Sequence, residues 1–231
     1  MRSVIRAVVF DVGETLVDET EAWGDWADWL GVPRLTFFAA LGGVIARGGD
    51  HREVFPLVRP GIDLRAEAAA REAAGRRAAV TIDDLYPDAV DCLRAVAADG
   101  YVIGIAANQP TTTEDVLRML DVPLALAAAS ESWNVHKPDP AFFRRIAAEL
   151  NLAPAEIAYV GDRLDNDVRP AAAAGMVAIF IRRGPWAYLQ AGRSEAHGAA
   201  ATIESLEELP GLLRRFAVGT AARGMATADP N

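Results

Sequence analysis

The sequence predicts an α/β fold, a doubly wound parallel sheet with a helical subdomain inserted after its first strand. Short apolar runs alternate with helical patterns over most of the 231 residues. The runs are continuously apolar, which is typical of strands that helices cover on both faces. One long segment, residues 19–82, contains helical patterns but no convincing strand. Alternation of strands and helices predicts the doubly wound core, and the exceptional segment predicts the insertion.

The elements of the core can be placed in order. The expected strands are 4–11, 101–108, 124–130, 157–162 and 177–183, and the expected helices are 87–98, 113–120, 139–150, 166–174 and 203–216. Thr111 and Glu114 have the spacing of a capping box, which would begin the second of these helices. The sequence thus predicts a core of residues 1–18 and 83–217, a helical subdomain of residues 19–82, and a disordered tail of residues 218–231.

Within the helical subdomain, Trp23, Trp26 and Trp29 lie three residues apart and share one stripe of a helix. We expect them to pack against apolar neighbours in preference to stacking on a ligand. Further on, Arg47, His51 and Arg52 could reach an anionic ligand from a loop. A solvated turn between two helices is the competing and simpler interpretation of this loop.

Composition excludes several functional classes. The net charge of −9 disfavours binding to nucleic acid or to anionic lipid. No run approaches the roughly 18 apolar residues of a membrane span, and the N-terminus lacks a secretory pattern, so we expect a cytoplasmic protein. Cys92 is the only cysteine, which excludes a disulfide within the chain and a thiolate metal site. Of 23 basic residues, Lys137 is the only lysine, which indicates a position that a guanidinium cannot fill.

Polar residues follow the predicted strands at the edge where ligands bind in open parallel sheets. They are Asp11, Gly13, Glu14 and Thr15 after the first strand, Asn108 and Gln109 after the second, Lys137 beyond the third, and Asp162, Asp165, Asn166 and Asp167 after the fourth. Carboxylates and a backbone carbonyl are oxygen ligands that Mg²⁺ prefers, and a phosphoryl group can complete its coordination. An aspartate there could attack phosphorus and form an aspartyl-phosphate.

These segments resemble the motifs of the haloacid dehalogenase-like hydrolase superfamily. "FDVGETL" is similar to the first motif, "IGIAANQ" occupies the place of the second, Lys137 with Pro138 that of the third, and "VGDRLDNDV…AAGM" that of the fourth. The resemblance covers residues 5–17 and 84 to about 216. Residues 19–82 stand where many members insert a helical cap that closes over the site and selects the substrate.

The resemblance implies a role for each matching residue. Asp11 would be the nucleophile and a Mg²⁺ ligand, with the Gly13 carbonyl and Asp162 as further ligands and Asp167 as a direct or outer partner of the ion. Lys137 would hold the nucleophile and the transferring group. Backbone amides of Asn108 and Gln109 would bind the phosphate of a small phosphorylated metabolite.

Two positions depart from the pattern of the family's phosphatases. The second aspartate of the first motif, which protonates the leaving group and then activates water, is replaced by Gly13, and the Ser or Thr of the second motif by Ala107. Acid–base assistance is typically worth about 10² to 10⁴ in rate. Glu14 is the nearest candidate substitute, with Asp18 and Glu19 further along; a solvent-facing turn residue is the alternative interpretation of Glu14.

Three other functions compete with that of a magnesium-dependent phosphatase. A dehalogenase of this superfamily also lacks the second aspartate, but it works without metal and does not need Asp162. A phosphonate hydrolase needs a lysine in the cap, and residues 19–82 contain none. A catalytically silent relative, which binds a metal or phosphate without turnover, remains a second hypothesis. The oligomeric state cannot be inferred from the sequence.

Overall fold

The computed structural model describes residues 4–76, 80–192 and 198–225. Six strands form one sheet: β1 (Ala7–Phe10), β2 (Val102–Ala107), β3 (Leu124–Ala129), β4 (Ile157–Gly161), β5 (Val177–Ile181) and β6 (Ala201–Ile203). All neighbours are parallel, in the order β3-β2-β1-β4-β5-β6. The predicted doubly wound sheet is confirmed, and β6 is an edge strand that the sequence analysis missed.

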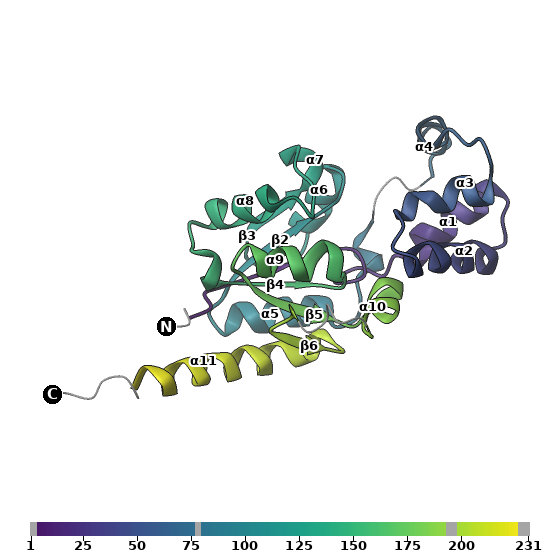
Figure 1. Ribbon diagram of the computed structural model, residues 1–231. Helices are drawn as coiled ribbons and strands as arrows, with labels where there is room; N and C mark the ends of the chain where they lie inside the picture. The colour runs from purple at the N-terminus through teal and green to yellow at the C-terminus, as the bar shows by residue number, and fades with distance from the viewer. Residues whose placement is uncertain (1–3, 77–79, 193–197, 226–231) are drawn as a thin grey trace.

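Helices cover both faces of the sheet (Figure 1). On one side lie α5 (Ala89–Ala98) and α11 (Leu209–Met225), and on the other α8 (Pro140–Leu150) and α9 (Arg169–Ala173). Successive side chains of β1 point to opposite faces, so Val8 and Phe10 pack in one apolar cluster and Val9 in the other. Continuous apolarity in β1 therefore follows from burial on both sides.

The strand order reverses between β1 and β4. In open parallel sheets, ligands bind at the carboxyl edge beside such a point. The Asp11 N–H donates to the Val160 carbonyl at 2.9 Å, which extends the pairing of β1 with β4 to the first residue beyond the strand. The pairing of β1 with β2 and with β4 thus fixes the backbone position of Asp11.

A helical insertion follows β1 in the chain. It comprises α1 (Thr20–Leu30), α2 (Arg34–Ala46), α3 (Val54–Val58) and α4 (Leu64–Ala73), with short 3-10 turns η1 (His51–Glu53) and η2 (Ile82–Asp84). These helices have their own apolar cluster, which includes Phe37 and Phe55, and Trp23 and Trp26 pack against it as predicted. Trp29, predicted to pack with them, is not part of this cluster, and its Nε1 donates to Glu67 at 2.7 Å. Trp186 of α10 (Gly184–Gln190) joins the same cluster, so α10 connects the insertion to the sheet domain (Figure 1).

Several local predictions need correction. The capping box at α6 (Thr112–Arg118) is absent, because the Thr111 N–H and hydroxyl both donate to Glu131 while Glu114 accepts from the Ala129 N–H. The C-terminal helix begins at Leu209 and continues to Met225, past the predicted end at 216 and into the tail predicted to be disordered. Residues 226–231 of that tail lie outside the described residues.

Two helices were not expected, α7 (Ser130–Trp133) and α10. Cys92 is buried in the core, as predicted. Within the described ranges no single helix is long and apolar enough to cross a membrane; α1 and α2 pass that test only as a pair, and they meet at 114°.

Candidate active site

The chain turns tightly after Asp11. The N–H groups of Leu16 and Val17 both donate to the Val12 carbonyl, at 2.9 and 3.0 Å, and close a compact loop. The returning chain segment before α5 pairs with this loop, because Tyr86 N–H donates to the Leu16 carbonyl at 2.9 Å. Arg183 braces the loop from the other side through the Thr15 carbonyl at 3.1 Å. The turn that carries Asp11 is therefore held by three separate parts of the chain.

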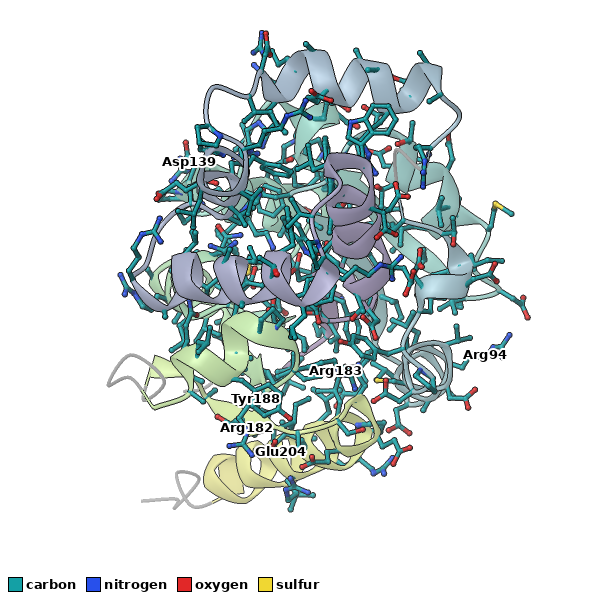
Figure 2. The ribbon with its side chains drawn as sticks, turned by 90° about the vertical axis from the view of Figure 1, so that its right-hand side faces the viewer. Arg94, Asp139, Arg182, Arg183, Tyr188 and Glu204 are labelled. Carbon is teal, nitrogen blue, oxygen red and sulfur yellow. The ribbon has the colours of Figure 1, made fainter. Side chains whose placement is uncertain are left out.

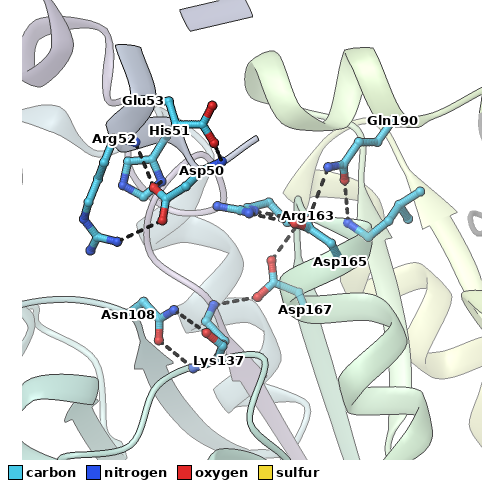
Figure 3. Close-up of polar contacts among 11 residues, drawn as sticks. Asp50, His51, Arg52, Glu53, Asn108, Lys137, Arg163, Asp165, Asp167 and Gln190 are labelled. Carbon is cyan, nitrogen blue, oxygen red and sulfur yellow. Dashed lines mark hydrogen bonds and ion pairs between the residues drawn. The ribbon is translucent and has the colours of Figure 1, made fainter. Parts of the chain in front are cut away.

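Lys137 lies in the middle of the site. Its Nζ atom is 2.6 Å from Asp11 Oδ1 and 2.5 Å from Asp167 Oδ1, and the residue is 4% exposed. Asn108 at the end of β2 holds the lysine backbone through two hydrogen bonds of 2.8 and 2.9 Å, which Figure 3 shows together with the ion pair to Asp167. The two carboxylates raise the pKa of Lys137 well above its usual value, against the opposing effect of burial. The ammonium is therefore charged.

Asp162 follows β4 and completes a cluster of three buried carboxylates. Ligand atoms of Asp11, Asp162 and Asp167 all lie within 4.8 Å of one another. The buried Asp162 Oδ2 atom has no hydrogen-bond partner among the described residues. Burial raises the pKa of Asp162 well above its usual value, and the charges of Asp167 and Asp11 raise it further. A bound cation would remove this electrostatic cost.

Asp167 is fixed by the backbone around it. It lies on a π-helical turn, Leu164–Val168, and its Oδ2 accepts from the Arg163 N–H at 3.1 Å. Gly161 is required here, because a Cβ atom at that position would be 2.5 Å from the Cβ of Asp167. Burial raises the pKa of Asp167 to about 6, although Lys137 lowers it. Its buried carboxylate is therefore held by two contacts, from Lys137 and from the Arg163 N–H.

This donor set fits a hard divalent cation. When ionised, three carboxylates and one ammonium carry a net charge of −2 in a site without solvent exposure. Oxygen ligands converge from two strands, and one of the oxygen atoms, Asp162 Oδ2, has no other partner. Mg²⁺ prefers such oxygens and leaves coordination positions for water or phosphate.

Glu14 does not face solvent, so that interpretation of its position in the turn is wrong. The residue is 5% exposed and has a φ of 53°. Its carboxylate accepts from the Tyr86 hydroxyl at 2.7 Å and from the Glu19 N–H at 3.2 Å. Burial is the main cause that raises the pKa of Glu14. The contacts show Glu14 fastening the start of α1 to the turn.

Glu19 occupies the space beside Gly13. A Cβ atom built on Gly13 would lie 2.5 Å from Glu19 Oε1 and 2.9 Å from its Cδ. Trp23 Nε1 donates to Glu19 Oε2 at 3.2 Å, which fixes the carboxylate from α1. Burial raises the pKa of Glu19 to about 7, and the charge of Glu14 adds to this effect. From the sequence, Glu19 was only a secondary candidate after Glu14. The missing side chain at Gly13 was the signal that another residue could occupy that space.

A cavity of about 1120 Å³ lies over the carboxylates, between the sheet and the helical insertion. Asp11, Glu19, Lys137 and Asp162 line it, together with His51 and Arg52 from the insertion. Figure 3 shows the loop of residues 50–53 across from Lys137. Burial lowers the pKa of His51 to about 4.

Arg47 lies apart from this cavity and pairs with Glu53 at 2.6 Å. Of the three loop residues that could reach a ligand, the structure therefore brings His51 and Arg52 to the cavity.

The predicted phosphate-binding residues, Asn108 and Gln109, line the cavity but also form hydrogen bonds within the protein. The Asn108 side chain is engaged by Lys137, and the Gln109 N–H donates to the Ala107 carbonyl at 3.0 Å. Both residues still line the cavity. Arg182 and Arg183 follow the carboxyl end of β5. Arg182 pairs with Glu204 and lies over Tyr188 on the outer surface, as Figure 2 shows. Arg183 turns inward, to the Thr15 carbonyl.

Comparison with known proteins places this geometry in a family. The model of the haloacid dehalogenase-like hydrolases matches residues 5–175. A plasmid-borne phosphoglycolate phosphatase of Cupriavidus necator is 30% identical over 94% of this chain and 96% of its own length.

Two further similarities cover the chain differently. A glyceraldehyde 3-phosphate phosphatase of Methanopyrus kandleri is 36% identical, but the match spans only 44% of this chain and 45% of that protein. The solved structure of an L-2-haloacid dehalogenase superposes with a TM-score of 0.69 at 16% identity, over 92% of this chain and 100% of that one.

The chain therefore belongs to the haloacid dehalogenase-like hydrolases. Structural likeness at 16% identity shows the fold alone, and this fold carries enzymes that cleave different bonds. The reaction must be argued from the side chains at the strand ends.

Proposed function

We propose that this protein is a magnesium-dependent phosphatase that hydrolyses a small phosphorylated metabolite through an aspartyl-phosphate on Asp11. One observation carries the proposal: three buried carboxylates surround a common point beside a buried ammonium group, and one carboxylate oxygen there has no partner. A metal-free dehalogenase has no need for this arrangement. The phosphatases among the similar proteins support the same class of substrate.

Each residue has a distinct task in this proposal. Lys137 fixes Asp11 Oδ1 and offsets negative charge on the transferring group, while Asn108 holds the lysine in register. Asp11, the Gly13 carbonyl, Asp162 and Asp167 would hold Mg²⁺. The bound ion would supply charge stabilisation for the phosphoryl oxygens. Asp11 is buried at the cavity, where a phosphoryl group held by Lys137 and the ion would lie beside its carboxylate.

We further propose that the helical insertion, residues 19–82, acts as a cap. Its helices pack together in one apolar cluster, and its loop of residues 50–53 lies over the cavity. Closure would exclude water from the phosphoryl transfer, and His51 and Arg52 would contact the part of the substrate beyond the phosphate.

A paired assay tests the proposed reaction. Purified protein is incubated with p-nitrophenyl phosphate, 2-phosphoglycolate and glyceraldehyde 3-phosphate, with Mg²⁺ or with EDTA, and phosphate release is measured. We expect release that falls by at least about 10²-fold in EDTA, because the ion stabilises the developing charge. A parallel incubation with 2-chloropropionate follows chloride release, for which we expect background rates.

Two results would contradict the proposal. Chloride release at the same rate with and without EDTA would favour a dehalogenase. Binding of Mg²⁺ and phosphate without release from any of the three phosphate esters would favour the silent binding protein.

A further inference from the structure

Gly13 and Glu19 form a matched pair. The space that a side chain at position 13 would need is already filled, since Glu19 Oε1 lies 2.5 Å from the Cβ position. The Glu19 carboxylate reaches this place from the first residues of the insertion, next to α1, whereas a residue at 13 would reach it from the turn after Asp11. An aspartate at 13 and the native Glu19 carboxylate thus compete for the same volume.

Two contacts fix Glu19 in this position. The Glu14 carboxylate accepts from its backbone N–H, and Trp23 donates to its Oε2. Oε1 is the atom nearest to the Cβ position of Gly13, and Glu19 lines the cavity that Asp11 and Lys137 also line. Glu14, by contrast, directs its carboxylate to Tyr86 and to α1. Both glutamates line the cavity, but Glu19 is the one whose carboxylate fills the space beside Gly13.

We propose that Glu19 is the catalytic acid and base of the reaction, in the place of the side chain that Gly13 lacks. This assignment rests on the proposed phosphatase function. In the first step Asp11 forms a bond to phosphorus, the bond from phosphorus to the leaving oxygen breaks, and that oxygen takes the proton of the Glu19 carboxyl group. In the second step the Glu19 carboxylate takes a proton from water as the water oxygen bonds to phosphorus. The Asp11 oxygen–phosphorus bond then breaks, which releases phosphate and restores the Asp11 carboxylate and the protonated Glu19 carboxyl group.

Rapid-mixing kinetics with p-nitrophenyl phosphate separate a chemical role from a structural one. p-Nitrophenolate leaves without a proton, so Glu19→Gln should keep the first turnover within about tenfold of wild type. Hydrolysis of the aspartyl-phosphate still needs the base, so later turnovers should slow by about 10² to 10⁴. The variant should thus show a burst of p-nitrophenolate. Glutamine keeps the size of the side chain and an acceptor for Trp23, and Glu21→Gln, exposed on the same helix, is the matched control.

A compensating double variant tests the shared space. Gly13→Asp alone should gain little, because Glu19 blocks the aspartate. Glu19→Ala should slow steady turnover by about 10² to 10⁴-fold. The double variant, Gly13→Asp with Glu19→Ala, should turn over at least about tenfold faster than Glu19→Ala alone.

Three results would overturn the assignment: equal slowing of both kinetic phases in Glu19→Gln, no slowing of either, or no recovery in the double variant. Failure of the underlying function is distinguishable, because then wild type would show no turnover that depends on Asp11.

Discussion

Asp11→Asn is expected to lower phosphate release by at least about 10⁴-fold, to the background of the assay, while the protein remains folded. The amide is nearly the same size as the carboxylate but is a very poor nucleophile, so no covalent intermediate can form. Asp11 follows β1, which pairs with β2 and β4, and its buried carboxylate contacts Lys137 at the cavity. Steady-state kinetics with p-nitrophenyl phosphate and Mg²⁺ measure the loss.

A mass measurement adds a direct control for this prediction. Acid-quenched wild type should carry one additional phosphoryl group during turnover, and Asp11→Asn should carry none. Asp165→Asn, which changes an exposed carboxylate paired with Arg163, should retain the wild-type mass shift. A labelled Asp11→Asn protein would assign the nucleophile to a different residue.

Lys137→Met is expected to destabilise the fold as well as the reaction. The substitution leaves Asp11 and Asp167 buried without their shared cation, and breaking such a buried pair typically costs about 3–5 kcal/mol. In a chain of this size that corresponds to a fall in melting temperature of about 6–20 °C. Thermal unfolding without Mg²⁺ measures the effect, and turnover with Mg²⁺ should fall by at least about 10²-fold because the charge near the phosphoryl group is lost.

Arg94→Met provides the comparison for Lys137→Met. Arg94 forms an exposed ion pair with Asp121 at 3.1 Å, and such pairs are worth about 0–1 kcal/mol. Its melting temperature should stay within a few degrees of wild type. Equal melting temperatures for Lys137→Met and wild type would show that the buried ammonium does not hold the site together.

The sheet and the main residues of the site could be predicted from the sequence because burial leaves a strong local signal. Continuous apolarity marked β1, β2, β4 and β5, and the residues after the strands had to meet at one edge once the strands were parallel. Lys137 stood out because it is the only lysine among 23 basic residues. These inferences needed no knowledge of long-range side-chain contacts.

The residues that the sequence analysis misjudged all depend on such contacts. Glu14 follows the nucleophile motif and was open to a solvent-facing interpretation, but Tyr86, 72 residues further on, draws it inward. Thr111 and Glu114 have the correct spacing for a capping box, yet both found partners near α7. Short elements such as β6 contain too few residues to show a period. Glu19 lies only six residues after Gly13, and its place beside that glycine follows from the shape of the turn before α1, which no periodic pattern records.

Asp11 and Asp162 are expected to bind one divalent cation together. Calorimetric titration with Mg²⁺ tests this expectation most directly. Wild type should bind one Mg²⁺ per chain, and Asp162→Asn should bind at least about tenfold more weakly because it loses a charged ligand. Asp165→Asn, at an exposed position three residues away, should bind as wild type does. Wild type that binds no Mg²⁺, or Asp162→Asn that binds it equally well, would contradict the account.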